Sequence, residues 1–201
     1  IIAHTRSKKR ASQILSLKAP TIIGMPIEPQ RENVIPIFGD WSSTGSVAAK
    51  HFFERGFTNF GYFGSSKLRW SSGREEGFTQ AVEREGYTVN SYDMRISGKK
   101  NLSAELKKVS QWLRSLTKPV AVMAENDDFG QYLLEACARA AIRVPEEVAV
   151  IAVDNDELIC NMTNPPLSSI DTEAEKAGYQ AAELLDEMMT GNTIEQRQIV
   201  V

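Results

Sequence analysis

The sequence predicts an α/β protein in which parallel sheets are covered by helices on both faces. Short apolar runs alternate with longer amphipathic stretches along the whole chain, and this alternation is typical of parallel βαβ units. Two runs, 119–124 and 148–153, are almost wholly apolar, as strands buried on both faces are. The amphipathic stretch at about 128–141 joins them and completes one such unit.

Further strands are predicted where short apolar runs end at Gly, Pro or polar residues. These runs lie at 21–24, 34–38 and 59–63, and a last one closes the chain at 198–201. Amphipathic periodicity predicts helices at about 7–17, 43–55, 73–85 and 173–189. The clearest helix repeats apolar residues at spacings of four, three, four and three, and they are Leu102, Leu106, Val109, Leu113 and Leu116.

Composition limits the classes of function. The chain has 201 residues, 42% of them hydrophobic, and a formal net charge of -3, so its overall charge does not attract DNA or an anionic membrane. No apolar run approaches the roughly 20 residues that span a bilayer, and the first residues lack the order of a secretory signal. A cytoplasmic location is therefore expected. The spacing of Cys137 and Cys160 suits buried thiols rather than a disulfide scaffold.

Signals of catalysis or cofactor binding are poor. His4 and His51 are the only histidines and have no metal-ligand spacing. Phosphate-binding, dinucleotide-binding and nucleophile-elbow motifs are absent from the sequence. The acidic string 154–157 lacks the glycine and the distal glutamate of an EF-hand loop. We therefore expect a protein that is not an enzyme and that uses neither a cofactor nor a metal.

Polar residues follow three of the predicted strands. Ligands of parallel α/β sheets bind beyond the carboxyl ends of the strands. Glu125, Asn126, Asp127 and Asp128 follow one strand, Asp154 to Asp156 follow another, and Arg69, Trp70 and Arg74 come after a third. A sugar presents hydroxyls around apolar C–H faces, so carboxylate, amide, guanidinium and indole groups suit it.

Each of these residues also has a simpler interpretation. The aspartates at 127, 128, 154 and 156 fit helix capping equally well. Arg74 fits a surface ion pair with Glu75 or Glu76, and Trp70 fits packing in the core. The residues alone leave these alternatives open.

Several segments, in this order, resemble the effector-binding domain of the lactose-repressor and galactose-repressor family, which has a two-lobed periplasmic-binding-protein-like fold. They are GD at 39–40, AAKHF at 48–52, GF at 56–57, REEGF at 74–78, END at 125–127, VPEEVAVIAVDN at 144–155 and PPLSSI at 165–170. Within this family the pairing of Arg69-Trp70 with Arg74-Glu75 and the run DNDEL at 154–158 most resemble the bacterial xylose-operon regulators. Those regulators carry their DNA-binding domain after the sensor.

The resemblance implies that Arg74, Asn126 and Asp154 contact a monosaccharide effector, a pentose such as xylose in the first instance. It implies a partial N-terminal lobe at 1–38 and 173–191, and a C-terminal lobe at 40–170 and 193–201. It also implies a homodimer that binds operator DNA through a domain outside this chain, since no helix-turn-helix pattern is visible in the sequence. A periplasmic sugar receptor of an uptake system, with the same fold, is the alternative function.

The chain departs from the family pattern at three places. The first lobe lacks the family's opening strands and helices, so contacts from that part are not expected here. Trp41 stands where the family usually has Asn, and Ala174 stands where some members place an aromatic ring. These differences put the shape of the pocket in question. The candidate ligand-binding residues are Arg74, Asn126, Asp154, Trp70, Asp128 and Trp41.

Overall fold

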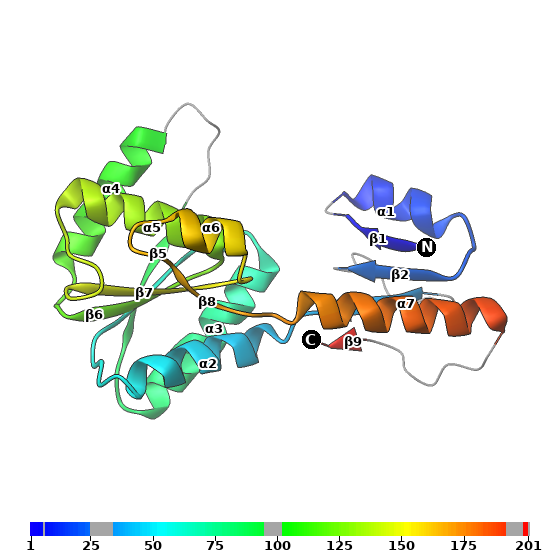
Figure 1. Cartoon of the computed structure of the whole chain (residues 1–201), viewed down its shortest axis with the longest axis horizontal. Coiled ribbons are helices and arrows are strands. Elements are labelled where there is room, and N and C mark those ends of the chain that lie inside the picture. Colours follow the sequence, from blue (N-terminus) through cyan, green and yellow to red (C-terminus); the bar gives the residue numbers. More distant parts are fainter. Residues whose placement is uncertain (6, 25–33, 95–101, 192–198, 201) are drawn as a thin grey trace. The chain divides into compact units, whose positions relative to one another are not determined.

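The structure is a computed structural model that describes residues 1–5, 7–24, 34–94, 102–191 and 199–200. The predicted α/β class is confirmed, because every strand pairing in it is parallel and helices flank the sheets (Figure 1). The chain divides into two compact units, Ile1–Asp40 with Glu173–Val201 and Trp41–Thr172. In the described part of the chain, no helix has the length and apolar character needed to cross a membrane.

The smaller unit contains a four-stranded sheet with the order β1-β2-β3-β9. Its strands are β1 (Ile2–His4), β2 (Thr21–Gly24), β3 (Val34–Phe38) and β9 (Ile199–Val200), and its helices are α1 (Lys8–Leu15) and α7 (Ala174–Thr190). Ala181 and Leu184 of α7 pack against Ile22 and Ile35 of the sheet. This contact is the core of the unit, and it fits the apolar stripe expected for the last helix.

The placement of β9 differs from the lobe boundaries expected from the resemblance. The resemblance implies that residues 193–201 belong to the C-terminal lobe, but Ile199 pairs with Ile37 and Val200 with Phe38 in the smaller unit. Gly191, in the left-handed conformation with φ 81°, ends α7. The glycine marks the end of a helix, and a helix end alone does not tell which sheet the next strand joins.

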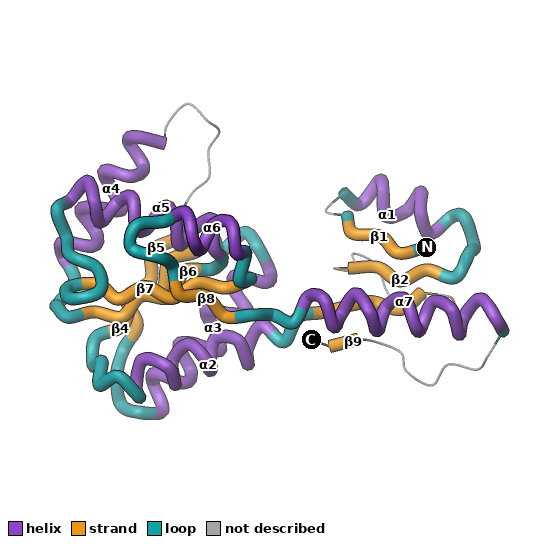
Figure 2. The backbone as a smooth tube through the Cα atoms, viewed as in Figure 1, coloured by secondary structure: helices purple, strands orange, loops and turns teal. Residues whose placement is uncertain are grey.

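The larger unit contains a five-stranded sheet with the order β5-β4-β6-β7-β8. Its strands are β4 (Phe60–Gly64), β5 (Val89–Asp93), β6 (Val120–Ala124), β7 (Val148–Val153) and β8 (Ser168–Ile170). Its helices are α2 (Trp41–Phe53), α3 (Arg69–Arg84), α4 (Leu102–Ser115), α5 (Asp127–Ala140) and α6 (Glu157–Met162). Helices cover both faces of the sheet (Figure 2).

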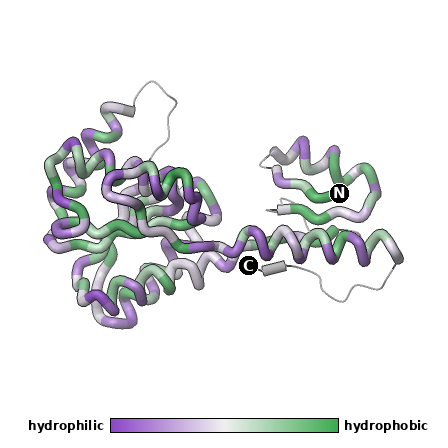
Figure 3. Tube along the Cα trace, viewed as in Figure 1, coloured by the Kyte–Doolittle hydropathy of each residue, from purple (hydrophilic) through white to green (hydrophobic). Residues whose placement is uncertain are grey.

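Strand β6 shows how the two faces are filled. Val120, Val122 and Ala124 belong to the core formed with α4 and α5, whereas Ala121 and Met123 belong to the core formed with α2 and α3. The alternation follows from the two-residue period of a strand. Because both faces are buried, the strand is apolar throughout, and the strands at the centre of this unit are among its most hydrophobic parts (Figure 3).

Helix α3 begins at Arg69, earlier than the predicted start at about residue 73. Its N-cap residue, Leu68, makes no side-chain capping hydrogen bond, so the sequence carries no capping signal there. The earlier start places Trp70 and Arg74 four residues apart in one helix, on neighbouring positions of the same face.

Two glycines allow α2 and α3 to pack closely. A Cβ atom on Gly45 would lie 2.3 Å from the carbonyl oxygen of Arg74, and one on Gly77 would lie 2.1 Å from the carbonyl oxygen of Ser42. Side chains of any size are excluded at such distances. The glycines therefore set the position of α3, the helix that carries Arg74.

Candidate functional site

Arg74 connects polar groups from two neighbouring strands of the larger unit. Its Nη2 donates to Oδ1 of Asp154 at 3.0 Å, and its Nη1 donates to the carbonyl oxygen of Glu125. The Arg74 side chain is 8% exposed while that of Asp154 is 48% exposed. The buried Nε of Arg74 has no hydrogen-bond partner among the described residues. The pair thus joins an anchored guanidinium to a carboxylate that solvent reaches.

Trp70 covers the guanidinium of Arg74. The Cζ atom of Arg74 lies 5.1 Å from the centroid of the Trp70 ring, a distance at which a cation is attracted to the face of an indole. Trp70 is half-buried, so neither simple core packing nor free exposure describes it. Its contact with Arg74 restricts the rotamers of both side chains.

Trp41, the first residue of α2, lies against the same helix. A Cβ atom on Gly73 would approach the Cβ of Trp41 to 2.9 Å and Cε3 of its ring to 3.1 Å. Trp41 and Trp70 therefore both lie at the N-terminal part of α3, beside Arg74. The structure brings these three candidate residues together.

Asn126 and Asp128 lie at the start of α5. Asn126 is the N-cap, and its Oδ1 accepts a hydrogen bond from the backbone N–H of Phe129 at 3.0 Å. Its amide N–H groups are not used by this cap. Asp128 is exposed in the first turn. The capping interpretation weighed for the aspartates applies at this helix to the neighbouring asparagine instead.

Glu125 is a buried residue that the sequence analysis did not select. Its carboxylate is fully buried, with Oε2 accepting from the backbone N–H of Ser65 at 2.6 Å and Oε1 lacking a partner among the described residues. Burial raises the pKa of Glu125 above its ordinary value of 4.5, although hydrogen bonds from Ser71 and Ser65 and the charge of Arg74 oppose the shift. The sequence feature that could have identified Glu125 is its position directly after the fully apolar run at 119–124.

Asp127 lies beneath the loop that contains Asp154. It is 2% exposed, and its Oδ2 accepts from the backbone N–H of Asp156 at 2.7 Å while its Oδ1 accepts from the hydroxyl of Ser169 at 2.6 Å. Asp156 caps α6 by accepting from the N–H groups of Leu158 and Ile159. Capping therefore explains Asp156 but not Asp127.

Asp154 adopts a backbone conformation that few residues other than glycine take. Its φ is 106°, and that of Asn155 is 53°. Such conformations cost about 1–3 kcal/mol each and are found most often at functional sites. Burial raises the pKa of Asp154 above its ordinary value of 3.8, the charges of Asp127 and Asp128 add to the shift, and Arg74 opposes it.

These residues form one polar edge of the larger unit, beyond the carboxyl ends of β6 and β7. It offers guanidinium and amide donors, carboxylate acceptors and an indole ring. In the described ranges, no three His, Cys, Asp or Glu side chains lie together as metal ligands would. The arrangement can bind a small polar molecule through directed hydrogen bonds.

Fold and site together define an α/β binding protein with two units, and comparison with known proteins identifies the family. The chain belongs to the periplasmic binding protein-like domain family, whose model matches residues 49–201. The resemblance to the repressor family and to the xylose-operon regulators is confirmed by individual relatives.

Curated relatives include the xylose operon regulatory proteins of Haemophilus influenzae and Escherichia coli K12. The first is 31% identical over 158 residues, covering 77% of this chain and 41% of the relative. The second is 31% identical over 154 residues, covering 75% and 39%. The chain thus spans about two fifths of the length of these relatives. The transcriptional repressor PurR of Photobacterium profundum is 30% identical over 76% of this chain and 46% of its own length. These relatives are transcription regulators, a class that is not enzymatic.

Solved structures agree with this assignment. The xylose-binding transcription activator xylR matches with a TM-score of 0.84 and 26% identity, over all of this chain and 54% of that one. A regulator from Alkaliphilus metalliredigens, complexed with D-xylulofuranose, matches with a TM-score of 0.78 and 20% identity, over all of this chain and 73% of that one. The second match supports the fold.

Proposed function

We propose that this chain is the effector-sensing domain of a transcription regulator and that its effector is a monosaccharide, with D-xylose as the first choice. The observation that carries the proposal is the pair formed by the buried Arg74 guanidinium and the half-exposed Asp154 carboxylate. The pair presents donors and acceptors at the edge of the sheet where ligands of this fold class bind. The similarity to two xylose operon regulatory proteins supports the choice of sugar.

Each polar residue has a distinct part in binding. Arg74 donates to two neighbouring hydroxyls, and the Asp154 carboxylate accepts from two. Asn126 donates through the amide N–H groups that its capping bond leaves unused. Trp70 keeps the guanidinium in place through its ring. Asp128 and Trp41 border the site and limit the size of the sugar that it accepts.

The related alternative is a periplasmic receptor of an uptake system, which would have the same fold. The names of the relatives favour a regulator that acts in the cytoplasm. We also propose that the protein catalyses no reaction, since the relatives named above are transcription regulators. Comparing the protein in cytoplasmic and periplasmic fractions separates the two functions.

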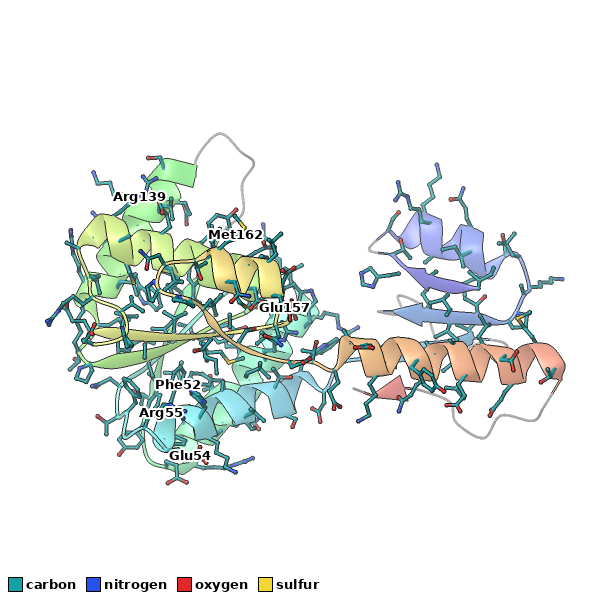
Figure 4. The ribbon with its side chains drawn as sticks, viewed as in Figure 1. Phe52, Glu54, Arg55, Arg139, Glu157 and Met162 are labelled. Atoms are coloured by element: carbon teal, nitrogen blue, oxygen red, sulfur yellow. The ribbon has the colours of Figure 1, made fainter. Side chains whose placement is uncertain are left out.

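We propose that the full-length protein is a homodimer that binds operator DNA through a domain outside this chain. An effector domain of this kind acts by moving two DNA-binding units relative to each other. Leu158 and Met162, one turn apart on α6, are 69% and 73% exposed, and Figure 4 marks Met162 at one end of this helix. Such an exposed apolar pair suits a contact with a second copy. The net charge of -3 gives this chain no electrostatic affinity for DNA.

A thermal-shift panel tests the proposed effector class. D-xylose is expected to raise the melting temperature of the full-length protein through binding linkage, and D-glucose is expected to raise it less. The additional hydroxymethyl group of glucose must find volume in the site. If a phosphate ester, a purine or an amino acid stabilises the protein and no free sugar does, the proposal is wrong.

A further inference from the structure

We infer that Asp127 and Ser169 are positioning residues that keep Asp154 in its ligand-binding place. The inference rests on the proposed function, because it assigns a role to two residues beneath the proposed sugar contact. Asp127 is 2% exposed and so lies beneath the surface that a ligand reaches. Its effect on a ligand is exerted through the loop 154–156.

The backbone N–H groups of this loop are fixed one after another. That of Asp154 donates to the carbonyl oxygen of Ile170 at 3.0 Å. That of Asn155 donates to the hydroxyl oxygen of Ser169 at 2.9 Å, and that of Asp156 donates to Oδ2 of Asp127 at 2.7 Å. The hydroxyl of Ser169 in turn donates to Oδ1 of Asp127 at 2.6 Å. Two of the three loop N–H groups therefore depend on the pair formed by Asp127 and Ser169.

The loop needs these bonds because its backbone is strained. Asp154 has a φ of 106°, and a non-glycine residue keeps such a conformation only where the surroundings enforce it; Asn155, with a φ of 53°, is in the left-handed region that asparagine tolerates. Without the two bonds, the loop relaxes towards ordinary backbone angles. The carboxylate of Asp154 then leaves its place beside Arg74, whose Nη2 it contacts at 3.0 Å.

The chemistry required at each position is specific. Residue 169 must accept from Asn155 and donate to Asp127, and only a hydroxyl does both there. Residue 127 must accept one hydrogen bond at each of its two terminal side-chain atoms, which a carboxylate does and an amide, with a single oxygen, does not. Ser169→Thr therefore preserves the network, whereas Ser169→Ala and Asp127→Asn break it.

A double-mutant cycle on the full-length protein tests the inference, with D-xylose as the probe in calorimetric titrations. Ser169→Ala is expected to weaken binding about tenfold, because the buried Asp127 and the backbone N–H of Asn155 each lose a hydrogen bond. Asp127→Asn is expected to weaken binding in the same direction, and Ser169→Thr is expected to bind as the wild type does. In a protein that already carries Asp154→Asn, Ser169→Ala is expected to have no further effect on affinity.

Val109→Ala in α4 is the control for general loss of stability. Val109 is fully buried and α4 carries none of the site residues, so this variant is expected to melt earlier and to bind D-xylose normally. If Ser169→Ala and Asp154→Asn weaken binding by factors that multiply, or if Ser169→Ala binds as tightly as the wild type, the inference is overturned. If Asp154→Asn itself binds normally, the proposed site fails and the inference fails with it.

Discussion

Glu125 places a carboxyl group in the interior beside Arg74. Its Oε1 has no partner among the described residues, and burial raises its pKa above 4.5. The folded protein therefore binds this proton more tightly than the unfolded chain does. The stability that this proton contributes is fully present below the ordinary pKa of 4.5. It is lost as the pH rises through the raised pKa of the folded protein.

Glu125→Gln removes this dependence on pH. The variant is expected to be more stable than the wild type at about pH 8, since an amide at position 125 cannot ionise in the interior. The difference should disappear towards about pH 3, where the carboxyl is neutral in both states. Urea unfolding at both pH values measures it. A variant that is less stable than the wild type at the higher pH contradicts this account of Glu125.

The charge of Asp154 makes the affinity for sugar depend on pH. The ionised carboxyl accepts charge-assisted hydrogen bonds at both oxygens, whereas protonation turns one of these oxygens into a donor. Burial together with the charges of Asp127 and Asp128 raises the pKa of Asp154 above 3.8. Affinity for D-xylose is expected to fall in acid, by about tenfold for each unit below that pKa. Asp128→Asn removes a charge that raises this pKa, so it should move the loss of affinity to lower pH. Calorimetric titrations across pH check both, and an unchanged profile in Asp128→Asn contradicts them.

Arg74, Asn126 and Asp154 were among the polar residues found after predicted strands, and the family resemblance singled them out as sugar contacts, a role that stays a prediction. The partners of these residues were less accessible. Asp127 is a helix-start aspartate in the sequence and resembles a cap, and its contact with Ser169 joins residues 42 positions apart. Such a contact depends on the tertiary structure that brings the start of α5 close to β8, which no local pattern encodes.

At the scale of elements, the contact between α2 and α3 positions the site. Gly77→Ala places a Cβ atom 2.1 Å from the carbonyl oxygen of Ser42, so the helices must separate. This variant is expected to lose about 1–3 kcal/mol of stability and to bind D-xylose more weakly, because Arg74 moves with α3.

Gly178→Ala in α7 is the matched control. Its Cβ meets no atom within 4 Å, so it is expected to gain about 0.5–1 kcal/mol from helix propensity. Denaturant unfolding and calorimetry measure both variants. Equal stability changes in the two would show that the close packing at Gly77 has no effect.

Most helices and strands followed from apolar periodicity, and the exceptions are informative. Strand β5 is largely exposed at the edge of its sheet, so its sequence carries little of the apolar signal of a strand. Helix α6 has six residues, too few to show a helical period. Its apolar residues Leu158 and Met162 point to solvent, which is unusual for a helix that covers a core.

At the scale of the whole molecule, two units with separate parallel sheets were expected from the resemblance. Their boundaries were harder to predict. β9 joins the sheet of the smaller unit through two paired residues, and so short a strand has no distinctive pattern. The unit to which a terminal strand belongs depends on the strand with which it pairs, and the amino-acid composition of the strand does not determine that partner.

The proposed dimer predicts that an acidic substitution on α6 reduces self-association. Met162→Asp should leave stability almost unchanged, since the side chain is 73% exposed. It should weaken the dimer, because the charge must be desolvated at the contact. Sedimentation velocity at micromolar concentration measures this, with the equally exposed Tyr179 in α7, 74%, as the site of a control Tyr179→Asp substitution. A wild-type protein that is monomeric contradicts the dimer, and an unaffected dimer in Met162→Asp contradicts the assignment of α6.

The central claim is that Arg74 and Asp154 bind a sugar, and calorimetric titration of D-xylose into full-length wild-type protein and a folded Arg74→Ala variant tests it most directly. The wild type should bind, and the variant should bind more than about tenfold more weakly, since charge-assisted hydrogen bonds contribute about 1.5–3 kcal/mol. Circular dichroism confirms that the variant is folded. Undiminished affinity in Arg74→Ala would contradict the account.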